Sequence, residues 1–599
     1  MNTFDQLDAL IAVNRKVADP LAVESETTRI CNLPIIWSHN EARAVVERLV
    51  NRPGGTWRLR DLQAEALYVI YKLQGGLIPL DVGEGKTLIA ALAPRLLKSK
   101  CTVILTTKAL TDEFWGEYEK YSQHFLVADR ATIHTVPYSL LSSRKNARIL
   151  EELEPDLIIA DEAHSLINRD SARTNRLRFY MESPAHCTTR FVAMTGTMFK
   201  ESVRDIQHLS MYALRHKGPI PLDNEQAAAW AACLDYDSNN AFSWMPQDSA
   251  PSDDQLGLMY QLQQAMGLNR DPSKAACRAA FYKRFATCEG VVTTENPTAL
   301  PQLYINRIEE DALPVPVEVR NALAYIRETG ETLDGEEVIL DEERMWAVEK
   351  QISCGYFYKW DWEAVGGYDE DWLLRRRTWH KELRDELARN GAQGYDSQFI
   401  ITMEIIRQIA DNPNLVRSSK LHWAWDYWSA VKDKPVPPRR AVWLSDFFLV
   451  DLLDRACTVG EPVLVWRSSD AVEDGLISLI TARGLQEGWR FFGAGSTIPY
   501  TGRGTYNALI STNVHRAGVN LQDWHRSIVA EPPASHIIWQ QMLGRLHRTG
   551  QIREPVFDVY THTAPFFRSL DTALSKAVFR EEIEGSPQKL LNAVWDRGE

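Results

Sequence analysis

The sequence predicts an α/β protein with two parallel-sheet lobes and a helical insertion between them. Short apolar runs alternate with helical stretches from about residue 56 to 215, and a second such series begins near residue 460. The stretch between the two series has a different composition and is rich in tryptophan. Runs that are apolar on both faces and separated by helices are typical of parallel strands covered on both sides.

The overall composition narrows the class of protein. The chain has 599 residues, 45% hydrophobic and 25% charged, which excludes disorder throughout. At roughly 100–200 residues per domain, this length predicts about three to five structural units. No run approaches the ~18 apolar residues of a membrane-spanning helix, and the first residues carry acids where a secretory signal needs bases. We therefore expect a cytoplasmic protein (in the host cytoplasm if a phage encodes it) with no membrane partner.

Charge and cysteine usage leave the partner open. The chain has 67 Lys and Arg against 80 Asp and Glu, a formal net charge of −13. This balance does not indicate a nucleic-acid partner, but it does not exclude one, because binding needs only a local basic groove. The eight cysteines form no C-x-x-C pair and no zinc spacing. We expect them to be reduced core thiols.

Each element can be placed from its local pattern. Residues 42–50 form an amphipathic run that Pro53-Gly54-Gly55 breaks. The expected strands are apolar runs at 77–80, 103–105, 157–160 and 191–194 in the first lobe, and at 463–466, 508–510, 528–530 and 556–560 in the second. The expected domain bounds are 1–55 for a helical lead-in, 56–310 for the first lobe, 311–435 for the insertion, 436–570 for the second lobe and 571–599 for a helical tail.

A glycine-rich segment follows the first expected strand. Gly83-Glu84-Gly85-Lys86-Thr87 opens a helix that we expect over 88–98. Glycines let backbone N–H groups close around phosphate oxygens, and a helix N-terminus favours negative charge. In such a loop Lys86 reaches the phosphates of a nucleotide, and the Thr87 hydroxyl ligates Mg²⁺. Taken alone the segment is also compatible with a glycine turn and a solvated lysine, because Leu80 replaces the first glycine of the full pattern.

Two carboxylates follow the expected strand at 157–160. Ligands of an open parallel sheet bind beyond the carboxyl ends of its strands, where Asp161 and Glu162 lie. Asp161 is placed to hold Mg²⁺, usually through water. Glu162 is placed to orient or deprotonate an attacking water. An acidic helix cap is the alternative for this motif alone, but its occurrence 75 residues after Lys86 argues against that alternative.

Two further segments carry polar groups suited to nucleotide chemistry. Residues 541–551 read QMLGRLHRTGQ. On a helix Gln541, Arg545 and Arg548 share one face, and two guanidiniums aimed at a γ-phosphate stabilise charge that develops during phosphoryl transfer. The alternative is a solvated basic helix end. Thr195-Gly196-Thr197, which ends another expected strand, is a weaker signal that a simple turn also explains.

Together these motifs resemble those of the superfamily 2 helicase-type ATPases, and within them the Swi/Snf-like branch in a compact bacterial, phage or mobile-element form. The resemblance covers about residues 56–215 and 440–565. The segments that carry it are 83–87 (motif I), Asp161-Glu162-Ala163-His164 (motif II, a DEAH box), 195–197 (motif III), 511–522 (motif V), 541–551 (motif VI), 58–63 (the upstream glutamine motif), and 105–108 and 135–140 (motif Ia and the next strand end).

The resemblance implies two RecA-like lobes with ATP and Mg²⁺ bound between them. By residue it implies catalytic roles for Lys86, Glu162, Gln541, Arg545 and Arg548, nucleotide contacts for Gln63, Gly83, Glu84, Gly85, Lys86, Thr87 and Gly518, and Mg²⁺ ligation by Thr87 and Asp161. In this scheme Gln63 reads the adenine edge.

The resemblance also implies a nucleic-acid partner. We expect DNA, with duplex favoured and single-stranded DNA or RNA as alternatives. The residues expected to contact its phosphates, independently of base sequence, are Thr106, Thr107, Lys108 and Thr512. Closure on ATP and opening after hydrolysis would move the lobes along the strand. One departure from the family pattern is His515-Arg516, which stand where small residues are usual.

The insertion leaves two interpretations open. Its eight tryptophans could stack on bases or split a duplex, but aromatic residues dominate core burial, and we favour a small helical core. Arg375-Arg376-Arg377, beside Trp379, could contact a phosphate backbone, although such a run is more often a solvated helix face.

The sequence therefore predicts a nucleic-acid-stimulated ATPase, in its most specific form a DNA translocase or remodeller. Two alternatives stay open. One is a strand-separating DNA or RNA helicase. The other is an ATP-gated binding or scaffold subunit of a replication, transcription or defence complex, with a protein partner on residues 1–50 or on the insertion.

Overall fold

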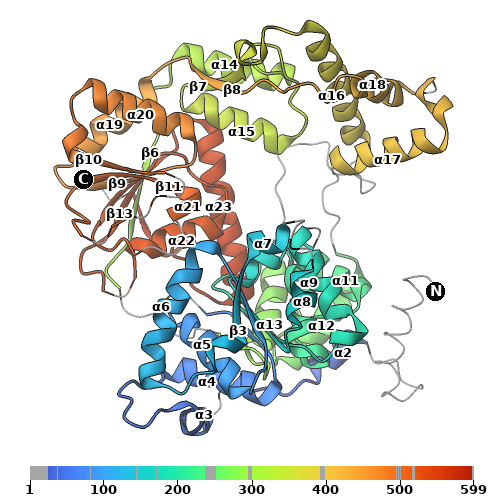
Figure 1. The fold of residues 1–599 in the computed structure, drawn as a ribbon, viewed down its shortest axis with the longest axis vertical. Coiled ribbons are helices and arrows are strands. Elements are labelled where there is room, and N and C mark those ends of the chain that lie inside the picture. The colour runs from blue at the N-terminus through green and yellow to red at the C-terminus, as the bar shows by residue number, and fades with distance from the viewer. Residues whose placement is uncertain are drawn as a thin grey trace. The chain divides into compact units, whose positions relative to one another are not determined.

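The computed structural model describes two compact α/β units. It covers residues 25–596 except 37, 39, 81–82, 144–145, 147, 170, 236–250, 294–299, 391–397, 418, 494–495, 497, 500, 516–519 and 549. The first unit is formed by residues up to 237, 250–299 and 575–592, and the second by 300–574 and 593–599. Each unit has its own parallel sheet, so the predicted α/β class with two RecA-like lobes is confirmed (Figure 1).

The sheet of the first unit has five parallel strands in the order β1-β5-β4-β2-β3. Their bounds are β1 Gly76–Ile78, β2 Thr102–Thr106, β3 Ile133–Pro137, β4 Leu157–Asp161 and β5 Arg190–Met194. Strand β5 lies between β1 and β4, with Ile78 opposite Met194 and Met194 opposite Asp161. The carboxyl ends of all five strands therefore meet at one edge, where the expected nucleotide residues follow β1 and β4.

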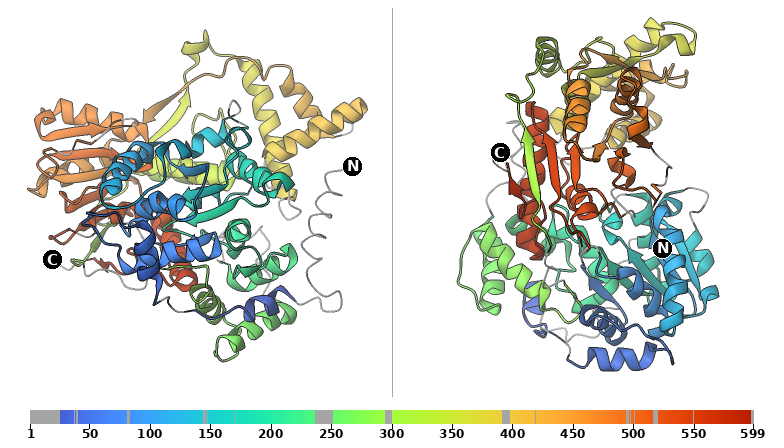
Figure 2. Two further views of the ribbon diagram at one scale, coloured as in Figure 1. Left: turned by 60° about the horizontal axis from the view of Figure 1, so that its bottom comes forward. Right: turned by 90° about the vertical axis from the view of Figure 1, so that its left-hand side faces the viewer.

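Alternating side chains of this sheet build two separate cores. Val103 and Leu105 of β2 join one core, whereas Ile104 between them joins the other. This division shows that helices cover both faces of the sheet (Figure 2). One face packs against α3 (Ala42–Val50), α4 (Asp61–Leu73), α5 (Lys86–Leu96) and α6 (Lys108–His124). The other packs against α2 (Glu26–Cys31), α7 (Tyr138–Ser142), α8 (Ile149–Leu153), α9 (Ala172–Glu182), α10 (Gln207–Leu214), α11 (Asn224–Leu234), α12 (Asp253–Ala265) and α13 (Lys274–Ala286).

The sheet of the second unit has seven parallel strands in the order β10-β11-β9-β12-β13-β6-β14. Strand β6, which our expected bounds place in the first lobe, pairs with β13 along its whole length. The strands are β6 Tyr304–Ile308, β9 Val463–Arg467, β10 Trp489–Phe492, β11 Asn507–Ser511, β12 Arg526–Val529, β13 Val556–Tyr560 and β14 Val594–Trp595. The helices that follow them are α19 Phe447–Thr458, α20 Asp470–Ala482, α21 Thr512–His515, α22 His536–Leu546 and α23 Ala564–Glu584.

The tryptophan-rich insertion extends from the second unit and is mostly helical (Figures 1 and 2). Its elements are α14 Val317–Thr329, α15 Glu342–Ser353, β7 Tyr356–Trp360, α16 Glu370–Asn390, α17 Gln398–Asp411, α18 Lys420–Ser429 and β8 Arg439–Trp443, with β7 and β8 antiparallel. Trp360, Trp372 and Trp379 are buried, which confirms the core interpretation for them. Trp423 differs, because it is 49% exposed and stacks on Tyr427.

The arginine run of the insertion is paired with acids. Arg375, Arg376 and Arg377 each form an ion pair, with Asp371, Glu337 and Glu331 respectively. These pairs favour a structural role for the run. Across the part of the chain that is described, no helix is both long and apolar enough to cross a membrane.

Candidate nucleotide-binding site

The glycine-rich loop has the backbone that its glycines predict. Gly83 and Gly85 have φ angles of 94° and 83°, a region that residues with a Cβ rarely adopt. Helix α5 begins at Lys86, directly after Gly85. Its first backbone N–H groups therefore point out of the helix end, as anion binding requires. The Lys86 ammonium donates a hydrogen bond to the carbonyl oxygen of Leu80 at 2.9 Å.

The upstream glutamine supports this loop directly. The Gln63 amide donates to the carbonyl oxygen of Glu84 at 3.1 Å and accepts from the backbone N–H of Arg60. Arg60 also donates to the carbonyl oxygen of Gly83 and pairs with the Glu84 carboxylate. A Cβ on Gly85 would lie 2.2 Å from Nε2 of Gln63. In this structure the predicted adenine-reading side chain therefore packs against the loop and requires glycine at position 85.

The two carboxylates lie at the carboxyl end of β4. Burial, with a smaller effect from the Glu162 charge, raises the pKa of Asp161 to about 7, while Lys86 lowers it. The Tyr138 hydroxyl donates to the backbone carbonyl of Asp161 at 2.8 Å. A buried carboxylate with a neighbouring carboxylate is stabilised by a cation, and Lys86 is one such cation.

His164 connects the second carboxylate to the end of the neighbouring strand. Its Nδ1 lies 3.2 Å from Oε2 of Glu162 and 3.1 Å from Oγ1 of Thr195. Oγ1 of Thr195 also accepts from the backbone N–H of Thr197. The loops after β4 and β5 are therefore connected through the side chains of Glu162, His164 and Thr195 at the same edge of the sheet.

A buried ion pair that the sequence did not reveal holds the loop after β5. Oε1 of Glu584 accepts hydrogen bonds from the backbone N–H groups of Met198 and Phe199, at 2.8 and 2.7 Å. Arg580 pairs with Glu584 at 2.9 Å and donates to the carbonyl oxygen of Gly196. Arg580 is fully buried. The C-terminal part of α23 thus fixes the backbone that follows Thr195.

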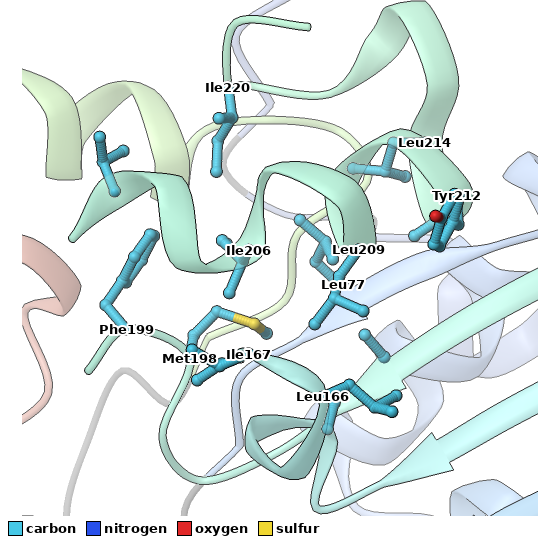
Figure 3. Close-up of a cluster of buried hydrophobic side chains, with 14 of the residues drawn as sticks. Leu77, Leu166, Ile167, Met198, Phe199, Ile206, Leu209, Tyr212, Leu214 and Ile220 are labelled. Carbon is cyan, nitrogen blue, oxygen red and sulfur yellow. The ribbon is translucent and has the colours of Figure 1, made fainter. Parts of the chain in front are cut away.

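Buried apolar side chains pack the same two loops against the core of the first unit. Figure 3 shows Leu166 and Ile167, from the turn after β4, gathered with Met198 and Phe199 from the loop after β5. Ile206, Leu209 and Ile220 complete this part of the core. Because all these side chains are buried, a shift of either loop would disturb the packing of the other.

The predicted residues of the second unit lie within or just after α22 and directly after β11. Gln541 and Arg545 are on α22, and Arg545 is only 8% exposed. The helix ends at Leu546, so the expectation that Arg548 shares a helical face with Arg545 is wrong. His547 leaves the helical conformation, and the carbonyl of Arg548 instead accepts from the backbone N–H of Gln551 in a turn. Gly518 lies outside the described residues.

The four residues expected to contact a strand differ in accessibility. Lys108 is exposed at the start of α6, and Thr107 is half-buried. Thr106 and Thr512 are 2% and 1% exposed. Oγ1 of Thr107 is buried as well, so of these four residues only Lys108 presents an accessible phosphate partner in this conformation.

The donors near the loop suit magnesium. The Thr87 hydroxyl and the Asp161 carboxylate are hard oxygen ligands, and Mg²⁺ commonly takes one or two protein oxygens with waters and substrate phosphates. Within the described ranges, no group of three or more His, Cys, Asp or Glu could hold a metal alone. This donor set fits an ion that arrives with the nucleotide.

Comparison with known families assigns the class of the first unit. Residues 56–200 match the family model described as type III restriction enzyme, res subunit (ResIII). This is a superfamily 2 helicase-type ATPase domain, and the chain therefore carries a domain of the helicase-like ATPase class. Domains of this class use ATP, usually with Mg²⁺, and typically bind nucleic acid. No curated protein matches the chain.

Proposed function

We propose that the protein is an ATP-hydrolysing motor of the Swi/Snf-like branch that translocates along or remodels duplex DNA. The observation that supports this most directly is the sheet edge of the first unit. There the loop 83–87 follows β1, and Asp161 and Glu162 follow β4. A phosphate cradle and a metal-binding carboxylate on one sheet edge are what phosphoryl transfer requires.

The site residues of the first unit have separate roles in the proposed reaction. Lys86 and the first N–H groups of α5 bind the β- and γ-phosphates of ATP. Thr87 and Asp161 hold Mg²⁺, which neutralises charge on those phosphates when it is bound. Glu162 accepts a proton from the attacking water. His164 keeps the Glu162 carboxylate oriented and links it to Thr195.

The remaining residues of the proposed reaction belong to the second unit. Gln541, Arg545 and Arg548 act on the transferred phosphoryl group, where an arginine is worth roughly 10³–10⁵ in rate. The alternatives are a strand-separating helicase and an ATP-gated binding subunit. The helicase alternative is favoured by exposed Trp423, which could stack on an unpaired base.

The deciding experiment measures ATP hydrolysis by the purified protein alone and with duplex DNA, single-stranded DNA or RNA. Lys86→Ala removes the phosphate-binding cation and is expected to abolish hydrolysis in every condition. Glu162→Gln is the matched variant, expected to bind ATP normally but to hydrolyse it about 10²–10⁴-fold more slowly, because it loses the general base.

The three nucleic acids distinguish the alternative functions by which of them stimulates ATP hydrolysis. Stimulation by duplex DNA supports translocation, which displacement of a triplex-forming strand then tests directly. Stimulation mainly by single strands or RNA supports the helicase alternative. Hydrolysis that stays absent under all conditions contradicts a self-sufficient motor and leaves the ATP-gated subunit.

A further inference from the structure

A basic cavity of about 480 Å³ lies in the first unit, next to the DEAH box. Two segments line it, residues 164–173 after β4 and residues 200–205 after β5. The first segment contributes Arg169 and Arg173, and the second contributes Lys200 and Arg204. Four cations therefore surround one space that opens beside His164.

The two described acids of the cavity wall have partners of their own. Glu201 pairs with Lys576 at 2.6 Å and with Lys200 at 3.9 Å, and Oδ2 of Asp205 accepts three backbone N–H groups from residues 200–202. Among the residues described, no carboxylate lies within ion-pair distance of Arg173 or Arg204, and Nε of Arg173 is buried without a hydrogen-bond partner. Arg173 and Arg204 consequently bring positive charge to the cavity that no described carboxylate in its wall neutralises.

The volume and the lining side chains of the cavity indicate which kind of ligand would fit it. Its volume is more than ten times the ~30 Å³ that one water occupies, so it has room for a sugar–phosphate unit. Among the described lining residues there is no Phe, Tyr or Trp and only one large aliphatic side chain, Ile167. The imidazole of His164 contacts Glu162 and Thr195, so the cavity offers little stacking surface for a base. Arginine forks are matched to phosphate oxygens.

We propose that this cavity binds the phosphodiester backbone of the nucleic-acid strand that stimulates ATP hydrolysis. The inference rests on the proposed function and extends it to a binding surface outside the motifs recognised in the sequence. Like charges on the two segments repel one another, and a phosphate between them removes that repulsion. Strand binding therefore favours close approach of the loops that carry Glu162 and Thr195, the two groups that His164 joins.

The test compares Arg173→Gln/Arg204→Gln with Arg270→Gln, which removes an exposed charge between α12 and α13 in the same unit. ATP hydrolysis and binding of a fluorescent oligonucleotide are titrated with duplex DNA, single-stranded DNA and RNA at several salt concentrations. The double variant is expected to need about tenfold more nucleic acid for half-maximal stimulation. The slope of log affinity against log salt should fall by about 1.4–1.8, at about 0.7–0.9 per lost phosphate contact.

The outcomes separate this inference from the proposed function. An Arg173→Lys/Arg204→Lys variant, which keeps both charges, should recover most of the salt slope and controls for misfolding. Equal slopes in the wild type, Arg270→Gln and the double glutamine variant would overturn the inference. If no nucleic acid stimulates the wild type but the double variant still weakens oligonucleotide binding, the proposed function fails and the cavity assignment stands. Absence of binding by the wild type overturns both.

Discussion

At the scale of single residues, Glu162, the proposed general base, has a strained backbone conformation. Its φ of 58° lies in the left-handed region, which costs a residue with a Cβ about 1–2 kcal/mol. This conformation turns the chain from β4 directly into the 3₁₀ turn at Ala163–Leu166. With this backbone, Oε2 of Glu162 lies 3.2 Å from Nδ1 of His164. Strain of this kind is commonly retained where a side chain must be aimed.

His208 makes the stability of the first unit depend on pH. Its Nε2 lies 3.0 Å from the carbonyl oxygen of Leu166, under the turn after the DEAH box. Burial lowers its pKa from 6.5 to about 4. Between these values the unfolded chain binds a proton that the folded chain does not, so stability falls as the pH falls from 6.5 towards 4. The expected loss between pH 7.5 and 5 is about 2 kcal/mol, at about 1.4 kcal/mol per pKa unit.

His208→Gln tests this prediction, because an amide can still donate to Leu166 but does not titrate. Denaturant unfolding at pH 7.5 and pH 5 should show a pH-dependent loss of stability that is about 2 kcal/mol smaller in the variant than in the wild type. An equal loss in both proteins would show that another group governs the acid sensitivity.

At the scale of elements, the C-terminal half of α23 acts as a clamp on the loop after β5. The clamp is the pair Arg580 and Glu584, whose hydrogen bonds reach the backbone of residues 196, 198 and 199 in that loop. Gln588 extends it by accepting a hydrogen bond from Arg580 at 3.1 Å. Because the loop follows Thr195, the clamp determines where the partner of His164 lies.

Substitution of the clamp should separate stability from activity. Arg580→Met leaves the buried carboxylate of Glu584 without its cation and is expected to cost about 3–5 kcal/mol. Arg580→Met with Glu584→Leu removes both charges and should recover much of that stability. The double variant still leaves the N–H groups of Met198 and Phe199 without their acceptor, so ATP hydrolysis should stay reduced.

Unfolding free energies and hydrolysis rates of the same samples check this expectation. Arg407→Met is the control, since it breaks an exposed pair with Glu404 and should change the unfolding free energy little. Full recovery of hydrolysis in the double variant would mean that the clamp only stabilises the fold.

Which elements could be predicted depends on where they lie in their sheets. Strands β4, β5, β9 and β13 were placed within one residue, because interior parallel strands are apolar on both faces. Strand β10, which carries Arg490 at a sheet edge, was missed, and edge strand β3, which carries His134, was indicated only by the strand end at 135–140.

The site was predictable only where its residues are contiguous. The loop 83–87 and the DEAH box are short motifs whose spacing has a chemical reason. The clamp was missed because Arg580 and Glu584 form an i,i+4 pair that normally indicates a solvated helix face. Nothing local reveals that this pair is buried against residues about 385 positions earlier. The end of α22 before Arg548 was missed because it depends on the turn with Gln551, which contacts residues outside the motif.

At the scale of the whole molecule, neither unit is a continuous stretch of chain. Residues 575–592 complete the first unit, although its other residues precede position 300. Phe579 and Ile583 from this segment are 1% and 0% exposed in the first unit's core. The first unit therefore takes part of its hydrophobic core from the far end of the sequence.

A chain that stops after Leu574 should destabilise the first unit selectively. Losing the burial of Phe579 and Ile583 removes about 3–6 kcal/mol, comparable with the whole stability of a typical domain. Limited proteolysis should then cut within residues 25–293 at much lower protease concentrations. A chain that stops after Asn592 keeps this segment and should resist cleavage there. Equal cleavage of the two truncated chains would contradict the prediction.

The position of residues 575–592 also has a consequence for synthesis. At about 5–20 residues per second, a ribosome needs roughly 15–55 s to travel from residue 299 to residue 575. Throughout that time the nascent first unit has all its strands but exposes the apolar surface that Phe579 and Ile583 later cover. The loop after β5 receives its contacts from Arg580 and Glu584 only after translation has passed the entire second sheet except β14. An interrupted chain that lacks this segment therefore exposes apolar surface of the first unit's core.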